Sequence, residues 1–324
     1  KERYFLRTFA IVNQKGGCGK TTTAINIAAV YAKRGLRTLI VDMDPQSHCA
    51  AGLGVPEEQI QSHIGDAMVG HHDHGLDRDE YLWEVTRNLH LAPSTMMLSA
   101  LEAPGSALHQ LPDRDRRLES LLNLWSEHFD RCIIDCPPNI GLLTYNALRA
   151  ATEAIIPVET GYFSIRGARR QRKTIEALIA RIGKPVACRI LPSIHRPSPL
   201  ARTLLQRLQE SFAPEVAPCV IRDHETLREA ASFGQPVVDF APDSDAERDF
   251  TSLVEWLEDI YVEKPIVEIQ AAPSNRAAEL AKRVASKPAP LENFPEPTVT
   301  EQPRTDSAVI GKITPSEDFD VSKF

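Results

Sequence analysis

The stretch Lys15-Gly16-Gly17-Cys18-Gly19-Lys20-Thr21-Thr22 is a glycine-rich turn with the pattern of a phosphate-binding loop. An apolar run of strand length, residues 9–12, precedes it, and a segment with helical spacing, residues 24–33, follows it. Glycines allow backbone conformations that a Cβ atom would block, so amide N–H groups at a helix N-terminus can converge on phosphate oxygens. We expect Lys20 to reach the β- and γ-phosphates of a nucleotide and Thr21 to offer its hydroxyl to Mg²⁺.

Apolar runs of strand length alternate with helical patterns along residues 8–262. This alternation predicts one α/β domain of the P-loop NTPase type, with a doubly wound, mostly parallel sheet and helices on both faces. The expected strands are residues 9–12, 38–41, 132–134, 154–156, 186–191 and 219–221. The expected helices lie near residues 24–33, 114–127, 141–150, 166–181, 199–212 and 244–262.

The remaining stretch, residues 263–324, differs in composition from the rest of the chain. It contains eight prolines and only isolated large apolar residues. Such a segment buries too little apolar surface to offset the entropy of ordering it. We therefore predict a Pro-rich, largely disordered tail, with a possible short helix at residues 277–285.

Two more segments place acidic residues directly after apolar strands. Asp42-Met43-Asp44-Pro45-Gln46 follows the expected strand 38–41, and Asp135 follows the expected strand 132–134. The carboxyl ends of parallel strands meet at one edge of a sheet, so these acids should lie near the phosphate-binding turn. An acid in the place of Asp135 is typical of the Walker B role, which holds Mg²⁺, often through water.

The turn departs from the general P-loop pattern, because Gln14 stands in the place of its first glycine and Lys15 opens the loop. In this it resembles the deviant Walker A ATPases, which include ParA-type partition proteins and MinD and whose loop reads K-G-G-x-G-K-[ST]. The resemblance extends to residues 42–46, which match the family's D-x-D-P-Q, and to the string of residues 135–144. It covers roughly residues 8–260.

The resemblance implies an ATPase that binds ATP with Mg²⁺ and closes into a homodimer. It implies that Lys15 reaches the nucleotide of the opposite subunit, that Asp44 orients water and metal for hydrolysis, and that Asp42 supports the site. Hydrolysis is expected to be slow without an activator. The expected catalytic residues are Lys15, Asp44 and Asp135, and the expected metal-site residues are Thr21, Asp44 and Asp135. The expected nucleotide-binding residues are Lys15, Gly16, Gly17, Cys18, Gly19, Lys20, Thr21 and Thr22.

Positive charge is concentrated in one part of an otherwise acidic chain. The whole chain has a net charge of −7, whereas residues 166–207 hold eleven Lys and Arg and a single acid. Such a basic block suits non-specific binding to the phosphates of double-stranded DNA. The candidate DNA contacts are Arg169, Arg170, Arg172, Lys173, Arg196, Arg202 and Arg222. A solvated basic face without a ligand remains the alternative.

ParA-type proteins bind DNA as ATP dimers and release it when a partner stimulates hydrolysis. The resemblance therefore implies a ParB-like or other activator protein, a cytoplasmic, nucleoid-associated location, and a plasmid, chromosome or protein assembly as cargo. A MinD-like membrane role is the alternative, but residues 277–285 carry only a weak apolar face and no run approaches the ~20 residues of a membrane span. We therefore expect no membrane partner.

Three other features leave questions open. An iron–sulfur protein of the same superfamily would need paired cysteines, and the six cysteines show no C-x-x-C spacing, so we expect reduced thiols. His71-His72-Asp73-His74 has the composition of a metal site, but flanking glycines favour a loop. The family often has T-x-x-D-x-R where this chain has Ser193-Ile194-His195-Arg196, which leaves the contacts to the base uncertain.

Overall fold

The computed structural model describes residues 6–70, 77–160 and 164–261. Its strands are β1 (Arg7–Ile11), β2 (Thr38–Asp42), β3 (Trp83–Thr86), β4 (Leu89–Ala92), β5 (Arg131–Asp135), β6 (Glu153–Glu159) and β7 (Ala187–Ser193). The predicted tail, the short helix considered at residues 277–285 and the cluster His71-His72-Asp73-His74 lie outside the described residues.

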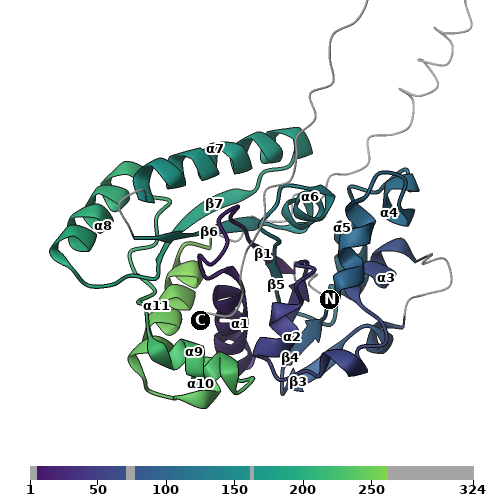
Figure 1. Ribbon diagram of the computed structural model, residues 1–324, viewed down its shortest axis with the longest axis horizontal. Coiled ribbons are helices and arrows are strands. Elements are labelled where there is room, and N and C mark those ends of the chain that lie inside the picture. The colour runs from purple at the N-terminus through teal and green to yellow at the C-terminus, as the bar shows by residue number, and fades with distance from the viewer. Residues whose placement is uncertain (1–5, 71–76, 161–163, 262–324) are drawn as a thin grey trace, which may run out of the picture. The chain divides into compact units, whose positions relative to one another are not determined.

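The helices alternate with these strands along the chain (Figure 1). The α-helices are α1 (Lys20–Lys33), α2 (His48–Gly52), α3 (Ile64–Val69), α4 (Ala107–Gln110), α5 (Arg117–Trp125), α6 (Leu142–Ala150), α7 (Ser164–Ile182), α8 (Pro199–Phe212), α9 (Glu225–Ser232), α10 (Val237–Phe240) and α11 (Asp245–Asp259). Three short 3₁₀ helices are η1 (Glu57–Gln59), η2 (Arg78–Glu80) and η3 (Met96–Glu102). None of the helices in the described part of the chain is long and apolar enough to cross a membrane.

The sheet has the order β3-β4-β2-β5-β1-β6-β7, and every neighbouring pair except β3–β4 is parallel. The predicted doubly wound, mostly parallel sheet is therefore confirmed. The antiparallel edge strand β3 was not predicted. Partly buried and exposed side chains alternate along β3. It therefore lacks the continuous apolar run that identified the central strands in the sequence.

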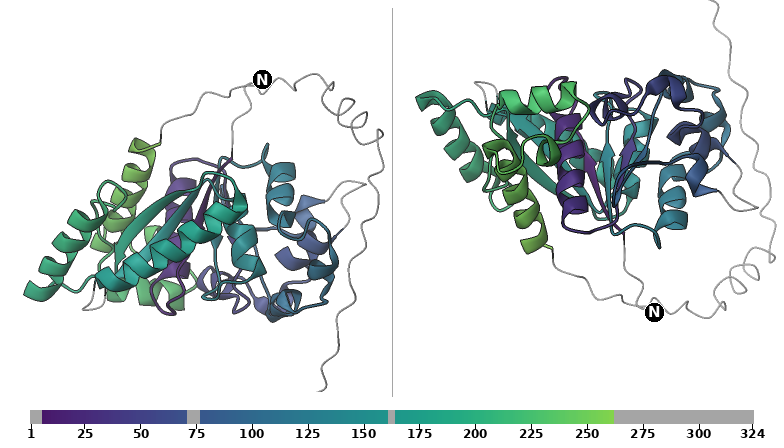
Figure 2. Two further views of the ribbon diagram at one scale, coloured as in Figure 1. Left: turned by 90° about the horizontal axis from the view of Figure 1, so that it is seen from above. Right: turned by 90° about the horizontal axis from the view of Figure 1, so that it is seen from below.

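Side chains alternate between the two faces of the central strands and build one core on each face. In β1, Ala10 belongs to the core that includes buried residues of α3, α5, α6 and α7, whereas Phe9 and Ile11 belong to the core that includes buried residues of α1, α2, α10 and α11. The two views in Figure 2 look onto these two faces, with α7 in front in one and α1 in front in the other. Because the helices that follow β1 and β5 cover opposite faces, the carboxyl ends of these adjacent strands border a crevice.

The strand predicted at residues 219–221 is wrong. The chain runs beside the edge strand β7 there, but it forms only isolated bridges, between Ile190 and Val216 and between His195 and Arg222. Prolines at 192 and 218 lack an amide hydrogen and so interrupt the ladder on both sides. The six cysteines are all free thiols, as expected, and those at 132 and 136 are fully buried.

A buried ion network joins the edge opposite the site to α11. Arg7, which is 1% exposed, donates to Glu153 on β6 at 2.8 Å, to Glu258 on α11 at 2.9 Å and to the carbonyl of Leu257 at 2.7 Å. A buried guanidinium is stable only while its hydrogen bonds are made. Arg7 therefore anchors α11 against β1 and β6.

Replacing Arg7 by alanine should lower the free energy of unfolding by about 3–5 kcal/mol, because Glu153 is left buried without its strongest partner. Urea denaturation checks this. Arg34→Ala is a matched control, since Arg34 at the end of α1 also contacts α11, through Glu255 at 3.2 Å, but this ion pair lies on the surface. Arg34→Ala should lower the free energy of unfolding by less than about 1 kcal/mol. Equal losses of stability in Arg7→Ala and Arg34→Ala would contradict the anchoring role of Arg7.

Candidate nucleotide site

The phosphate-binding turn forms an open cradle between β1 and α1. Gly17 and Gly19 have φ angles of 67° and 87°, in the left-handed region that favours glycine. A Cβ atom built on Gly16, Gly17 or Gly19 would meet nothing within 4 Å, so the inner side of the turn is open. Helix α1 begins at Lys20, and its first N–H groups have no intrahelical partner. The cradle therefore offers amide donors and the Lys20 ammonium to an anion.

Asp135 at the end of β5 lies against the first turn of α1. The hydroxyl of Thr21 donates to Asp135 Oδ2 at 2.6 Å, whereas the buried Oδ1 has no hydrogen-bond partner among the described residues. Burial raises the pKa of the Asp135 carboxyl to about 7, although the Thr21 hydrogen bond and the charge of Lys20 oppose the rise. An unpartnered carboxylate oxygen beside a hydroxyl is a donor set that fits Mg²⁺, which prefers oxygen ligands.

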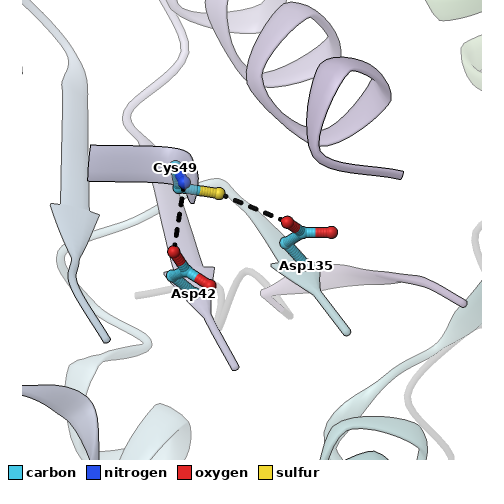
Figure 3. A group of neighbouring side chains, drawn as sticks. All are labelled: Asp42, Cys49 and Asp135. Carbon is cyan, nitrogen blue, oxygen red and sulfur yellow. Dashed lines mark hydrogen bonds between the residues drawn. The ribbon is translucent and has the colours of Figure 1, made fainter. Parts of the chain in front are cut away.

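A second buried acid, Asp42, lies near Asp135, with Cys49 hydrogen-bonded to both, as Figure 3 shows. Asp42 is fully buried, and its carboxylate accepts from the amide of Asp44 at 2.9 Å and from the amide of Cys49 at 3.2 Å. The Cys49 thiol lies 3.5 Å from Asp135 Oδ2 and donates to it. Burial, and then the two carboxylates, raise the pKa of Cys49, so the thiol keeps its proton. Cys49 thus links the two carboxylates, through its amide to Asp42 and through its thiol to Asp135.

Asp44 lies on the wall of a cavity of about 590 Å³ that the turn also lines. Its Oδ1 accepts from the amide of Gln46 at 3.1 Å, which holds the carboxylate in a tight turn after β2. The far wall of the cavity comes from the loop after β7 and from the segment that leads into α9. The structure therefore brings Gly16, Gly17, Gly19, Lys20, Thr21, Thr22 and Asp44 to one cavity, with Asp135 behind Thr21.

Lys15 and Cys18 lie outside the residues that line this cavity. The Lys15 side chain is 61% exposed, its amide donates to Asn13 Oδ1 at 2.9 Å, and its ammonium pairs with Glu159 at the end of β6. Cys18 is buried, and its carbonyl accepts from the hydroxyl of Ser193 at 3.2 Å. Lys15 thus stands at the rim, while Cys18 fixes the turn to β7.

The basic residues predicted for DNA binding fall into two groups. Arg169, Arg170, Lys173 and Arg202 are exposed on α7 and α8, and Arg172 on the same face pairs with Glu176 and Glu215 at 2.7 and 2.6 Å. Arg196 and Arg222 instead line the nucleotide cavity. The first pairs with Asp223 at 2.6 Å and the second with Asp249 at 2.7 Å.

Two charged residues at the site, Asp223 and Glu159, were not predicted from the sequence. Asp223 accepts from Arg196 at 2.6 Å and from Arg228 at 2.7 Å on the far wall of the cavity. The loop after β7 lacks the aspartate of the T-x-x-D-x-R pattern, and Asp223 supplies a carboxylate beside Arg196 from a later segment. Glu159, the partner of Lys15, was also missed. Neither residue belongs to a local motif, because each meets its partner only through the packing of distant segments.

Comparison with known proteins agrees with this geometry. A sequence model described as an AAA domain matches residues 6–187. The sporulation initiation inhibitor protein Soj of Bacillus subtilis is 31% identical over 242 residues, which cover 74% of this chain and 92% of Soj. The chromosome partitioning protein ParA of Myxococcus xanthus is 33% identical over 234 residues, which cover 72% of this chain and 81% of that protein.

Solved structures with a similar fold include other nucleotide-binding proteins. A cobyrinic acid a,c-diamide synthase from Mycobacterium smegmatis, with a bound ATP analogue and magnesium, is 25% identical with a TM-score of 0.65, over 78% of this chain and 94% of the other. Cyanothece McdA is 23% identical with a TM-score of 0.67, over 78% of this chain and 99% of the other. From its phosphate-binding turn, its acids and its relatives, the chain belongs to the ParA/Soj family of P-loop ATPases.

Proposed function

We propose that this protein is an ATP-driven dimerising switch that binds DNA without sequence preference and positions a cargo. A partner protein stimulates its ATP hydrolysis. The observation that carries the proposal is the pairing of Thr21 with Asp135, whose second oxygen has no hydrogen-bond partner among the described residues and lies near an open glycine cradle. Residues 8–262 form the ATPase domain in this proposal.

ATP with Mg²⁺ is the ligand that this arrangement fits. The amides of the turn and Lys20 take the β- and γ-phosphates, and Thr21 and Asp135 hold the cation, with Asp44 facing the same space. Mg²⁺ neutralises charge on the phosphates when it is bound. Relatives support this ligand, since the synthase structure contains an ATP analogue and magnesium, and a Borrelia burgdorferi plasmid partition protein, 20% identical, was solved with AMPPNP.

Hydrolysis depends on Asp44 and on a second subunit. Asp44 is buried on the cavity wall, where a carboxylate can orient the attacking water and accept its proton. Lys15 is exposed at the rim and does not line the cavity, which supports a role toward the phosphates of a facing subunit rather than its own. A second cation at a shared triphosphate offsets its charge, which couples ATP binding to dimerisation.

The exposed basic residues of α7 and α8 form the DNA surface. Arg169, Arg170, Lys173 and Arg202 are solvent-exposed, and no ion pair is recorded for their side chains among the described residues. Free cations of this kind neutralise DNA phosphates and release counterions. Arg196 and Arg222 line the cavity and are paired with acids, so they are less suited to DNA contact than the exposed cations.

The two lysines of the turn should fail in different ways. Lys20→Ala should abolish ATP binding, because the phosphates lose the one lysine that lines the cavity in the described part of the chain. Lys15→Ala should bind ATP with near-normal affinity but remain monomeric. Titration with a fluorescent ATP analogue measures ATP binding, and sedimentation velocity measures dimerisation. Each variant serves as the control for the other. A dimeric Lys15→Ala protein with ATP would contradict the role of this lysine.

Asp44→Ala should keep ATP binding and ATP-driven dimerisation and should lower kcat by about 100-fold or more, since general-base catalysis contributes at least that factor. Phosphate release and sedimentation with ATP are the measurements. Asp79→Ala, which removes an exposed acid of η2, is the control and should leave kcat unchanged. Turnover at the wild-type rate in Asp44→Ala would exclude this residue as the base.

DNA binding should require ATP and weaken steeply with salt. The double variant Arg169→Ala/Arg170→Ala should reduce the slope of log K against log salt by about 2 on unrelated duplexes. The matched control, Arg87→Ala/Arg116→Ala, removes two exposed arginines elsewhere and the same net charge, and should keep the wild-type slope. Equal binding with ATP and ADP, or no binding at low salt, would refute this part of the proposal.

A further inference from the structure

The turn that carries Asp44 is tied to the neighbouring strand by a serine fifty residues away. The hydroxyl of Ser94 donates to the carbonyl of Asp44 at 2.5 Å, and the carbonyl of Ser94 accepts from the hydroxyl of Ser47 at 2.8 Å. Ser94 is 0% exposed, so water cannot replace either hydrogen bond. These two bonds fasten both ends of the turn formed by residues 44–47.

The register of the sheet brings this serine to the turn. Strands β2 and β4 are parallel, with Val41 beside Ala92, so the residues that follow them leave the sheet at the same edge. Pro93 separates Ala92 from Ser94 and cannot donate to the ladder, and its carbonyl accepts from Ile64 at 2.9 Å. Ser94 is thereby held at the edge by its own strand rather than by the turn.

The peptide groups on both sides of the Asp44 side chain are fixed. The amide of Asp44 donates to Asp42 at 2.9 Å, and its carbonyl accepts from Ser94 and from the amide of Ser47 at 3.0 Å. Ser47 itself has a φ of 55°, in the left-handed region, where a non-glycine residue needs support from its surroundings. Without the Ser94 hydroxyl, the turn would keep its link to Asp42 but lose its strongest link to β4.

We propose that Ser94 is a positioning residue for ATP hydrolysis, which holds the Asp44 carboxylate in its place on the cavity wall. The inference rests on the proposed function, in which Asp44 orients the attacking water. A displacement of about 1 Å in such a group can cost up to about 100-fold in rate. The phosphate-binding residues lie in the turn between β1 and α1 and at the start of α1. Among the described residues the hydrogen bonds of the Ser94 side chain and carbonyl go to Asp44 and Ser47 and not to this turn, so we expect nucleotide binding to be independent of Ser94.

The test compares Ser94→Ala with wild-type protein in a steady-state ATPase assay. Kcat should fall about tenfold, while KM for ATP and ATP-driven dimerisation stay unchanged, and the ATP dimer should persist correspondingly longer after free ATP is removed. Ser99→Ala is the matched control, because Ser99 also donates to a backbone carbonyl, that of Met96 at 2.7 Å, but on the exposed side of η3. It should keep the wild-type kcat.

Ser47→Ala extends the test, because it removes the second bond to Ser94 and leaves the buried Ser94 hydroxyl in place. Its kcat should also fall with KM unchanged, and the double variant should lose less than the product of the two single losses, since both bonds hold one turn. Should Ser94→Ala prove unstable to heat, Ser47→Ala alone decides.

An unchanged kcat in Ser94→Ala, or a raised KM with an unchanged kcat, would overturn the inference; for an unstable Ser94→Ala, the same results in Ser47→Ala would do so. Wild-type protein without any ATPase activity would instead refute the proposed function, so the two failures are distinguishable.

Discussion

The alignment of three parallel strands is the constraint on which the site depends. In the register of the sheet, Asp135 lies beside Ile11 of β1 on one side and beside Asp42 of β2 on the other. This places the phosphate-binding turn, the Asp44 turn and Asp135 at one edge, although they are far apart in the sequence. A slip of one residue in β5 would turn the Asp135 side chain to the other face of the sheet and separate it from Thr21.

The site gathers acids that are unfavourable to bury. Burial, followed by the charge of Asp135, raises the pKa of Asp42, and burial likewise raises that of Asp135. Hydrogen bonds from two amides, the Cys49 thiol and the Thr21 hydroxyl offset part of this cost, and within the described part of the chain one oxygen of Asp135 remains without a partner. Such an arrangement favours a cation at this position, so ligand binding and local stability are coupled.

The opposite end of the sheet has the complementary design. There, Arg7 is buried but fully engaged with Glu153, Glu258 and a backbone carbonyl, and the network fixes α11 to the sheet. At the amino ends of the parallel strands the buried charges are thus paired with one another. At the carboxyl ends the charged and polar groups remain available to a phosphate and its cation. The difference between the two ends separates the residues that stabilise the fold from those that bind.

The sequence by itself determined the P-loop, the parallel sheet and the acids at its edge, because strand–turn–helix spacing is local and each acid directly follows an apolar run. It did not reveal the edge strand β3, the irregular path at residues 219–221, or the pairing of Lys15 with Glu159. It also did not separate Arg196 and Arg222 from the exposed cations of α7. Only the tertiary structure decided these points, because each depends on contacts between segments that sequence periodicity does not connect.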